Sequence, residues 1–278
     1  MMRRIVAYRA NRILYSFIKR NQICGSVIVP ANICQSVVDT LILAGMNLIY
    51  VDISKDTLCA DRASVIKVAP YASLFIFVHT YGVEMECPEW FSEVRKVNPG
   101  IVIIDDRCLC MPQQFFREEL ADLVLFSCCP KKQVDLGIGG IGFISGKLDY
   151  DEIPVEANPV LTNDIWQPEF DRMEQVRIAV SDHKSRLNRI YAESLPLDIQ
   201  LNERFQHWRF NILVPQKDLV LQSIFDAGVF ASSHYKSLSD SCSVATQLQS
   251  QVINLFNDFY YTEDQAIRTC EVIKRIIS

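Results

Sequence analysis

Two adjacent lysines follow an apolar stretch in the segment ADLVLFSCCPKKQVDLGIGGIGFIS, residues 121–145. The run DLVLFS (122–127) predicts a buried strand that ends at a serine, and a Gly-Gly pair precedes the next apolar run. A lysine at the mouth of a sheet can be ordinary surface chemistry, or it can be an amine that forms an imine with an aldehyde. Which of these holds depends on the elements that position the lysine.

Three other predicted strands end in residues that could take part in chemistry. They are followed by His79-Thr80-Tyr81-Gly82, by Asp105-Asp106-Arg107 and by Pro30-Ala31-Asn32. Ligands of open α/β sheets bind beyond the carboxyl ends of the strands. Each end alone could be an ordinary polar loop. Together, an acid, a hydroxyl and a lysine can bind a phosphorylated pyridine aldehyde: the carboxylate keeps the ring nitrogen protonated, the hydroxyl contacts the phosphate, and the lysine forms the imine.

The first half of the chain alternates short apolar runs with helical patterns. Helices are predicted at 34–45 and 88–97, and the basic, amphipathic stretch 1–20 predicts a first helix. Continuous apolar runs between helices are typical of strands covered on both faces, so we predict an α/β fold with a mostly parallel, seven-stranded sheet and flanking helices. The last run follows the lysine loop closely and could pair antiparallel. The predicted strands are 26–30, 47–52, 64–68, 73–79, 101–105, 122–127 and 140–145.

The pattern changes after residue 150. Residues 146–168 contain three prolines and no clean period, which predicts a crossing linker before a long helix at 169–195. We therefore divide the chain into a large α/β domain (1–150), a linker with a connecting helix (151–195) and a small α+β domain (196–278). The last part is predicted as strand 207–215, helix 217–227, strand 229–235, helix 242–252, strand 254–261 and helix 263–277, which begins after Thr262.

Composition excludes several classes of function. With 28 Lys and Arg against 33 Asp and Glu, the net charge of −5 argues against a nucleic-acid partner. No apolar run approaches the roughly 18 residues of a membrane span, and no signal peptide is recognised, so we expect a cytoplasmic protein without a membrane partner. The ten cysteines form no CxxC pair, which favours core thiols over disulfides or a metal site. Cys128 and Cys129 have no recognisable base for thiol catalysis.

Four blocks resemble, in order and spacing, consecutive blocks of the DegT family of sugar aminotransferases. They are SVIVPANICQSVVDTLILAGMNLIYVDISKDTL, FVHTYG, VIIDDRC and FSCCPKKQVDLGIGG, and the segment DAGVFASSHYKSL…VINLFNDFYYTED is similar to that family's closing block. The resemblance extends from about residue 8 to the end. It implies a homodimer of fold type I that uses pyridoxal phosphate (PLP). It also implies amino transfer from an amino acid such as glutamate to a nucleotide-linked keto-sugar, in surface-polysaccharide or related sugar biosynthesis.

The resemblance also implies roles for individual residues. It places the imine-forming lysine at Lys132, with Lys131 one step out of register. Asp106 matches the aspartate that pairs with the ring nitrogen, and Ser127 matches a phosphate ligand. The other positions that it suggests are Asn11 and Cys34 for the cofactor, and His79, Tyr81, His234 and Tyr235 for the substrate; His234 and Tyr235 could equally be a structural pair.

Several positions depart from the family's pattern. Cys34 stands where an aromatic residue usually covers the ring, Leu109 where His or Gln is usual, and Ala10-Asn11 in place of Gly-Thr/Ser. The family's Asn-Tyr-Arg block, which reaches the partner subunit, is not recognisable between 146 and 170. These departures leave open a degenerate homologue that keeps the fold for binding or assembly without transamination. Elimination on a sugar is disfavoured because Lys132 is present.

Overall fold

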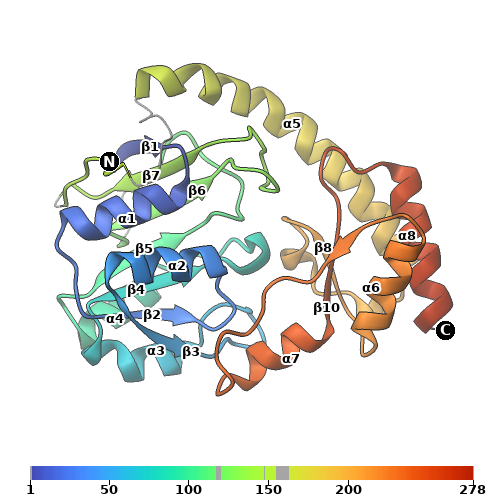
Figure 1. Cartoon of the computed structure of the whole chain (residues 1–278), viewed down its shortest axis with the longest axis horizontal. Helices are drawn as coiled ribbons and strands as arrows, with labels where there is room; N and C mark the ends of the chain where they lie inside the picture. The colour runs from blue at the N-terminus through green and yellow to red at the C-terminus, as the bar shows by residue number, and fades with distance from the viewer. Residues whose placement is uncertain (1, 117–119, 147, 155–162, 278) are drawn as a thin grey trace.

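The large sheet is mostly parallel. The structure is a computed structural model that describes residues 2–116, 120–146, 148–154 and 163–277. Its seven strands lie in the order β1-β7-β6-β5-β4-β2-β3, and only β7 runs antiparallel to its neighbours among the described strands (Figure 1). The strands are β1 (Arg3–Ala7), β2 (Ser26–Pro30), β3 (Asn47–Val51), β4 (Leu74–Val78), β5 (Val102–Asp106), β6 (Leu123–Ser127) and β7 (Gly140–Ile144). The predicted fold class is confirmed, including the antiparallel last strand.

Helices cover both faces of this sheet because its strands are apolar on both sides. Val27 and Val29 belong to the same buried cluster as Phe17 of one helix pair, whereas Ile28 between them packs in the cluster that contains Phe91 of the other pair. This alternation follows the two-residue period of a strand. The helices are α1 (Ala10–Arg20) and α2 (Gln35–Ala44) on one face, and α3 (Arg62–Val68) and α4 (Pro88–Val97) on the other.

The prediction of a helix over the first twenty residues is wrong at its start. Residues Arg3–Ala7 form the edge strand β1, which pairs antiparallel with β7, and α1 begins only at Ala10. Ile5, Val6 and Ala7 are buried by this pairing. The helical period of the following residues extends into this short apolar run, and only the tertiary partner β7 distinguishes a strand from a helix here.

The predicted strand at 64–68 is also wrong. These residues belong to helix α3, whose N-cap Asp61 accepts a hydrogen bond from the backbone N–H of Ser64 at 2.8 Å. Val65 is fully buried while its neighbours are half-buried or exposed, as expected for one face of a helix. The capping aspartate outweighs the β-branched composition of the run.

A three-stranded antiparallel sheet, in the order β8-β10-β9, follows in the last third of the chain. The predicted strands at 207–215 and 229–235 are present but shorter, whereas the third strand lies at 252–255 and shares only residues 254 and 255 with the predicted 254–261. Helix α5 starts six residues before the predicted 169. Part of the predicted crossing linker is therefore helical, and residues 155–162 lie outside the described part of the chain. The elements are α5 (Asn163–Ser194), β8 (Phe210–Leu213), α6 (Lys217–Asp226), β9 (Ala231–Ser232), α7 (Ser243–Gln251), β10 (Val252–Leu255) and α8 (Glu263–Ile277).

Two caps fix the small sheet's helices. Asp52, at the end of β3, accepts hydrogen bonds from the backbone N–H groups of Val244 and Ala245 at 2.9 and 3.0 Å, so the large sheet caps α7. Thr262 and Gln265 exchange hydrogen bonds in a capping box that starts α8, as predicted. Helix α5 runs along the molecule from the β1–β7 side of the large sheet to α8 (Figure 1).

Candidate functional site

The carboxyl ends of neighbouring parallel strands meet at one cleft, which we call the strand-end cleft. It has a volume of about 140 Å³, and it brings together Asp106 from β5, Ser127 from β6 and Lys132 from the loop after β6. Strands β5 and β6 are adjacent in the sheet, and Asp106 pairs with Leu125, two residues before Ser127 at the end of β6. The cleft is also lined by Asn11, Cys34, His79 and Tyr235, whereas Tyr81 and His234 do not line it.

The loop after β6 separates its two lysines. The backbone N–H of Lys132 donates to the carbonyl oxygen of Cys129 at 3.2 Å and closes a turn. Lys131 adopts a left-handed backbone conformation (φ 68°), which is uncommon for a residue with a side chain, and its N–H donates to Asp135. Lys132 lines the strand-end cleft and Lys131 does not. The turn thus presents the two neighbouring amines to different surroundings.

Gly139 and Gly140 set the start of α1 against the cleft. Gly139 has a φ of 117°, and a side chain at Gly140 would meet the backbone nitrogen of Ala10 at 2.3 Å. The close approach of β7 to the first turn of α1 therefore requires this glycine. Arg9, Ala10 and Asn11 line the cleft, and no described side chain caps the N-terminus of α1. Helix N-termini of this kind bind phosphate through their backbone N–H groups.

A buried ionic cluster stabilises the end of β5 on the side of Asp105. Asp105 accepts hydrogen bonds from His79 Nε2 at 2.7 Å and from Arg107 Nε at 2.6 Å, and both Asp105 and His79 are fully buried. Burial alone would raise the pKa of Asp105, but the charges and hydrogen bonds of His79 and Arg107 outweigh it and lower this pKa. His79 Nδ1 contacts the carbonyl oxygen of Val83 at 2.7 Å, so both ring nitrogens are engaged.

Asp106 points to the opposite side from Asp105 and faces the cleft. Its Oδ1 accepts a hydrogen bond from the backbone N–H of Cys108 at 3.0 Å, and its side chain is mostly buried. Burial and the nearby Asp106 carboxylate raise the pKa of the Cys108 thiol, and Lys132 opposes them. Asp106 and Lys132 thus act on the same thiol from within one cleft. The Cys108 thiol stays protonated at neutral pH.

Three aromatic rings join the small sheet to the large one behind the cleft. Tyr81 is fully buried, its ring stacks on Trp208 with centroids 6.3 Å apart and on Tyr235 at 6.4 Å, and its hydroxyl donates to the carbonyl oxygen of His234. Burial raises the pKa of Tyr81 above its usual value. Tyr235 therefore reaches the cleft from the small-sheet side, while Tyr81 acts as packing between the two parts.

The departures from the family's pattern lie in the cleft itself. Cys34 is half-buried directly before α2, and its sulfur contacts the hydroxyl of Ser36 at 3.2 Å. Leu109 is buried in the wall, and its carbonyl oxygen accepts a hydrogen bond from Gln133 at 3.1 Å. Neither position offers an aromatic face or an imidazole to a bound ring.

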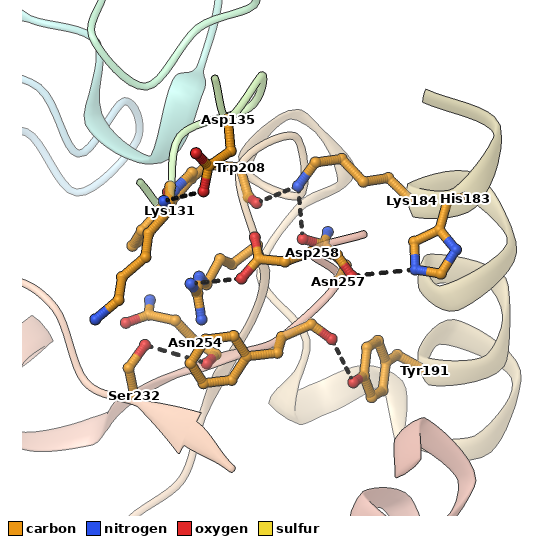
Figure 2. A network of polar contacts seen from close by, with 12 residues as sticks. Lys131, Asp135, His183, Lys184, Tyr191, Trp208, Ser232, Asn254, Asn257 and Asp258 are labelled. Carbon is orange, nitrogen blue, oxygen red and sulfur yellow. Dashed lines mark hydrogen bonds and ion pairs between the residues drawn. The ribbon is translucent and has the colours of Figure 1, made fainter. Parts of the chain in front are cut away.

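Sequence reasoning missed a polar network on α5. The charged run at 182–189 is typical of a solvated helix face, but Lys184 is buried, and its ammonium donates to Trp208 O and to Asn257 Oδ1, both at 2.8 Å (Figure 2). His183 Nε2 contacts the carbonyl oxygens of Asp258 and Tyr261 at 3.1 and 2.9 Å. The sequence around Lys184 gives no signal of its burial, because its partners Trp208 and Asn257 lie 24 and 73 residues further along the chain.

The network continues to the lysine loop. The indole N–H of Trp208 donates to the carbonyl oxygen of Lys131 at 2.8 Å, so Trp208 connects Lys184 with the residue before Lys132 (Figure 2). Arg209 is almost fully buried, donates to Asp258 at 2.8 Å and lies over the ring of Phe256. Trp208, just before β8, thus holds the lysine loop through the main chain of Lys131.

Comparison with known proteins gives a family and a set of similar folds. The family model of the DegT/DnrJ/EryC1/StrS aminotransferases matches residues 12–153, about half of the chain. No curated protein sequence matches this chain. Within the described residues, no helix is long and apolar enough to cross a membrane.

The solved structures that superpose on this chain are remote in sequence. A DegT DnrJ EryC1 StrS aminotransferase from Brucella abortus is 16% identical with a TM-score of 0.77, covering 98% of this chain and 85% of its own. A putative sugar aminotransferase from Streptococcus pneumoniae in its PMP-form is 15% identical with a TM-score of 0.79, covering 98% and 87%; it is also known in a PLP-form. DesI, in the presence of its TDP-sugar product, is 17% identical with a TM-score of 0.81, covering 98% and 80%. These likenesses confirm the predicted fold, and the PLP-form supports the predicted cofactor at the level of the family.

Proposed function

Because the chain belongs to the DegT/DnrJ/EryC1/StrS aminotransferase family, we propose that it is a sugar aminotransferase that holds PLP in the strand-end cleft. The observation that carries the proposal is that an acid, a hydroxyl and a lysine from adjacent strand ends line one cleft. The substrate would be a nucleotide-linked keto-sugar and the donor an amino acid such as glutamate.

The donor set fits the cofactor. Asp106 is the carboxylate that would keep the pyridine nitrogen protonated. Ser127 and the uncapped first turn of α1 supply hydroxyl and N–H donors for the phosphate, and Gly140 leaves room for that turn. Lys132 supplies the amine that holds the aldehyde. When bound, PLP supplies the electron sink on which amino transfer depends.

The residues around the strand-end cleft would then have different roles in the reaction. Lys132 Nζ would accept and return the proton that moves at the reacting carbon, which its place at the end of a tight turn allows. The cluster of Asp105, His79 and Arg107 would hold the end of β5 in place. It would thereby fix the direction in which the Asp106 side chain points. Tyr235 would close the cleft from the small-sheet side. We therefore assign His79 and Tyr81 to support, and keep Tyr235 as the substrate-side residue.

The setting of the reaction follows from the family resemblance. We place the protein in the cytoplasm, in surface-polysaccharide or related sugar biosynthesis, as a homodimer with a two-fold axis. The dimer is proposed because in fold type I enzymes the site usually lies at a two-fold interface. Since the family's partner-side block is not recognisable in this chain, residues 146–168 or another segment would have to close the cleft. Light scattering at micromolar concentration tests it. A strictly monomeric mass with PLP bound would contradict the shared site.

A second candidate function is favoured by Cys34 and Leu109, which line the cleft without an aromatic face or an imidazole. A homologue that binds the cofactor and assembles, but does not transfer the amino group, would fit these two positions.

The domain boundaries predicted at residues 150 and 195 are kept as part of the proposal.

One experiment separates the two candidates. The purified protein is loaded with PLP, and its visible absorbance is followed before and after addition of glutamate. A lysine-bound cofactor absorbs visible light, and amino transfer from glutamate to the cofactor should bleach it. A visible band that no amino acid bleaches would favour the homologue without transfer. No visible band after loading would contradict cofactor binding itself.

A further inference from the structure

A second cleft, larger than the first, opens on the other side of Lys132. It has a volume of about 260 Å³ and lies between the lysine loop, one face of α5 and the loop after β10, and we call it the α5 cleft. Lys132 lines both clefts. A ligand in the α5 cleft would therefore lie next to the amine that reacts in the strand-end cleft. The mechanism proposed above uses none of the other residues of the α5 cleft.

The α5 cleft is elongated. Arg172, Val176, Val180 and Lys184 line it at intervals of four residues, so they lie along a single face of the helix. Twelve residues of α-helix rise roughly 18 Å, which is the distance between the two ends of this row. The carboxylate of an amino acid would occupy only a small part of such a cleft. Its length suits an extended ligand.

The cleft has a buried positive charge in its floor. Lys184 is 5% exposed and donates to Trp208 O and Asn257 Oδ1, which are both neutral acceptors (Figure 2). An ammonium group has three donors. Among the described residues no carboxylate forms an ion pair with Lys184: the nearby Asp258 acts on its charge, but its carboxylate accepts from Arg209 instead. A buried cation of this kind is stabilised by a bound anion.

The two acids of the α5 cleft are already committed to other groups. Asp135 accepts from the backbone N–H groups of Lys131 and Gly137 at 3.1 and 2.8 Å, and Asp258 accepts from Arg209 at 2.8 Å. The cations Lys131, Lys132, Arg172 and Lys184 outnumber these two acids in the lining. The field inside the cleft therefore favours an anion with more than one negative charge.

Two exposed aromatic rings stand at the Lys184 end. Phe259 is 56% exposed and Tyr260 is 83% exposed, and both line the cleft. The ring of Phe259 lies 5.5 Å from that of His183, the neighbour of Lys184 on α5. Exposed aromatic faces beside cations are the surroundings in which a nucleobase stacks while its phosphates are held.

We propose that the α5 cleft binds the nucleoside diphosphate part of the substrate, with phosphate oxygens on Lys184, Lys131 and Arg172 and the base against Phe259 or Tyr260. The inference rests on the proposed function, because it assumes that the sugar extends from the diphosphate to Lys132. Burial lowers the pKa of Lys184 to about 8; Asp258 opposes this shift and Arg209 adds to it, and a bound dianion would raise the pKa again. Binding should therefore weaken as the pH rises above this value.

The test uses two matched arginines on α5. Arg172 pairs with Glu169 at 3.3 Å and Arg177 pairs with Glu174 at 3.1 Å, both three residues apart and about half exposed, but only Arg172 lines the cleft. Calorimetry on the PLP-loaded protein would measure binding of UDP, dTDP, GDP and CDP to the wild type, Arg172→Gln and Arg177→Gln. Because both changes are on the surface, neither should prevent folding.

We expect one of the nucleotides to bind to the wild type, with about tenfold weaker binding to Arg172→Gln and unchanged binding to Arg177→Gln. Inorganic pyrophosphate should compete with that nucleotide, whereas glutarate, a dicarboxylate of the donor class, should not. The proposal is overturned if no nucleotide binds, if both variants bind equally well, or if glutarate alone competes. The visible band of the loaded protein separates these failures from a failure of the proposed function, since it reports the cofactor whether or not a nucleotide binds.

Discussion

The two clefts that meet at Lys132 are built in different ways. The strand-end cleft is formed by the last residues of adjacent parallel strands and by the first turn of α1, so the sheet itself sets its geometry. The α5 cleft is formed by one long helix and two loops, and its shape depends on how the small sheet packs against the large one. In our two proposals, cofactor chemistry would rest on the sheet, and substrate recognition on a helix and loops outside it.

If the strand-end cleft is rigid because of its buried ionic cluster, breaking that cluster should have the largest effect. Asp105→Ala would leave His79 and Arg107 buried without their carboxylate, and we expect a loss of about 3–5 kcal/mol in the free energy of unfolding. Urea unfolding measures it. In the control Asp151→Ala, which removes the exposed pair with Arg20, the loss should be at most about 1 kcal/mol. Equal losses would mean that the cluster does not stabilise the site.

The next effect separates the chemistry of the strand-end cleft from its stability. Asp106→Asn keeps a hydrogen-bond acceptor for the backbone N–H of Cys108 but removes the charge that faces the cleft. We expect the rate of the half-reaction with glutamate to fall by about 10²–10³, with little change in stability. Single-turnover absorbance measures the rate. Asp39→Asn, an exposed change on α2, is the control, and a matching rate for the two variants would contradict the role of Asp106.

The buried Lys184 of the α5 cleft should make the free energy of unfolding depend on pH. The folded protein holds Lys184 at a pKa of about 8, below the 10.5 of the unfolded chain, so its buried charge costs stability at low pH. Between these values the unfolded chain keeps a proton that the native state has lost. The free energy of unfolding should therefore rise with pH by up to about 3 kcal/mol relative to Lys184→Met.

Urea unfolding of both proteins at about pH 7 and about pH 10 checks this linkage. The comparison with Lys184→Met removes the contributions of the other titrating groups, which both proteins share. If the difference between the two proteins is the same at both pH values, Lys184 is not titrating in the folded state, and the floor of the α5 cleft does not carry a strained charge.

The smallest effect is expected at Cys34. Among the described residues its thiol forms a hydrogen bond with the hydroxyl of Ser36 and otherwise packs against apolar side chains, and it offers no aromatic face to a bound ring. Cys34→Ala should change the affinity for PLP by about threefold or less, measured by titration of the visible band. A large loss would mean that the thiol itself contacts the cofactor, and that this position differs from the family in chemistry and not only in size.

Much of the strand-end cleft could be predicted because sheet geometry fixes it. Continuous apolar runs identified the parallel strands, and the residues directly after them had to meet at one edge. Asp106, Ser127 and Lys132 are therefore brought together as expected. Tyr81 also follows a strand, but its ring is fully buried and stacks on Trp208, so a place after a strand does not by itself bring a side chain to the cleft.

The α5 cleft could not be predicted, because no sheet geometry fixes the positions of its residues. Lys184 appears among other charged residues on a helix, and only the packing of α5 against the segment after β10 makes it a buried ammonium. Likewise, the predictions for residues 3–7 and 64–68 are wrong because their short patterns fit a helix or a strand equally well. In each case a distant partner or a local cap decides the structure.

The most direct test of the account is to locate the amine that holds the cofactor. The PLP-loaded protein is reduced with borohydride and digested, and the modified peptide is identified by mass spectrometry, with Lys131→Ala and Lys132→Ala treated in parallel. The account predicts the label on Lys132, a visible band that survives in Lys131→Ala, and no band in Lys132→Ala. A label on Lys131, or a band that survives only in Lys132→Ala, would contradict the assignment of the strand-end cleft.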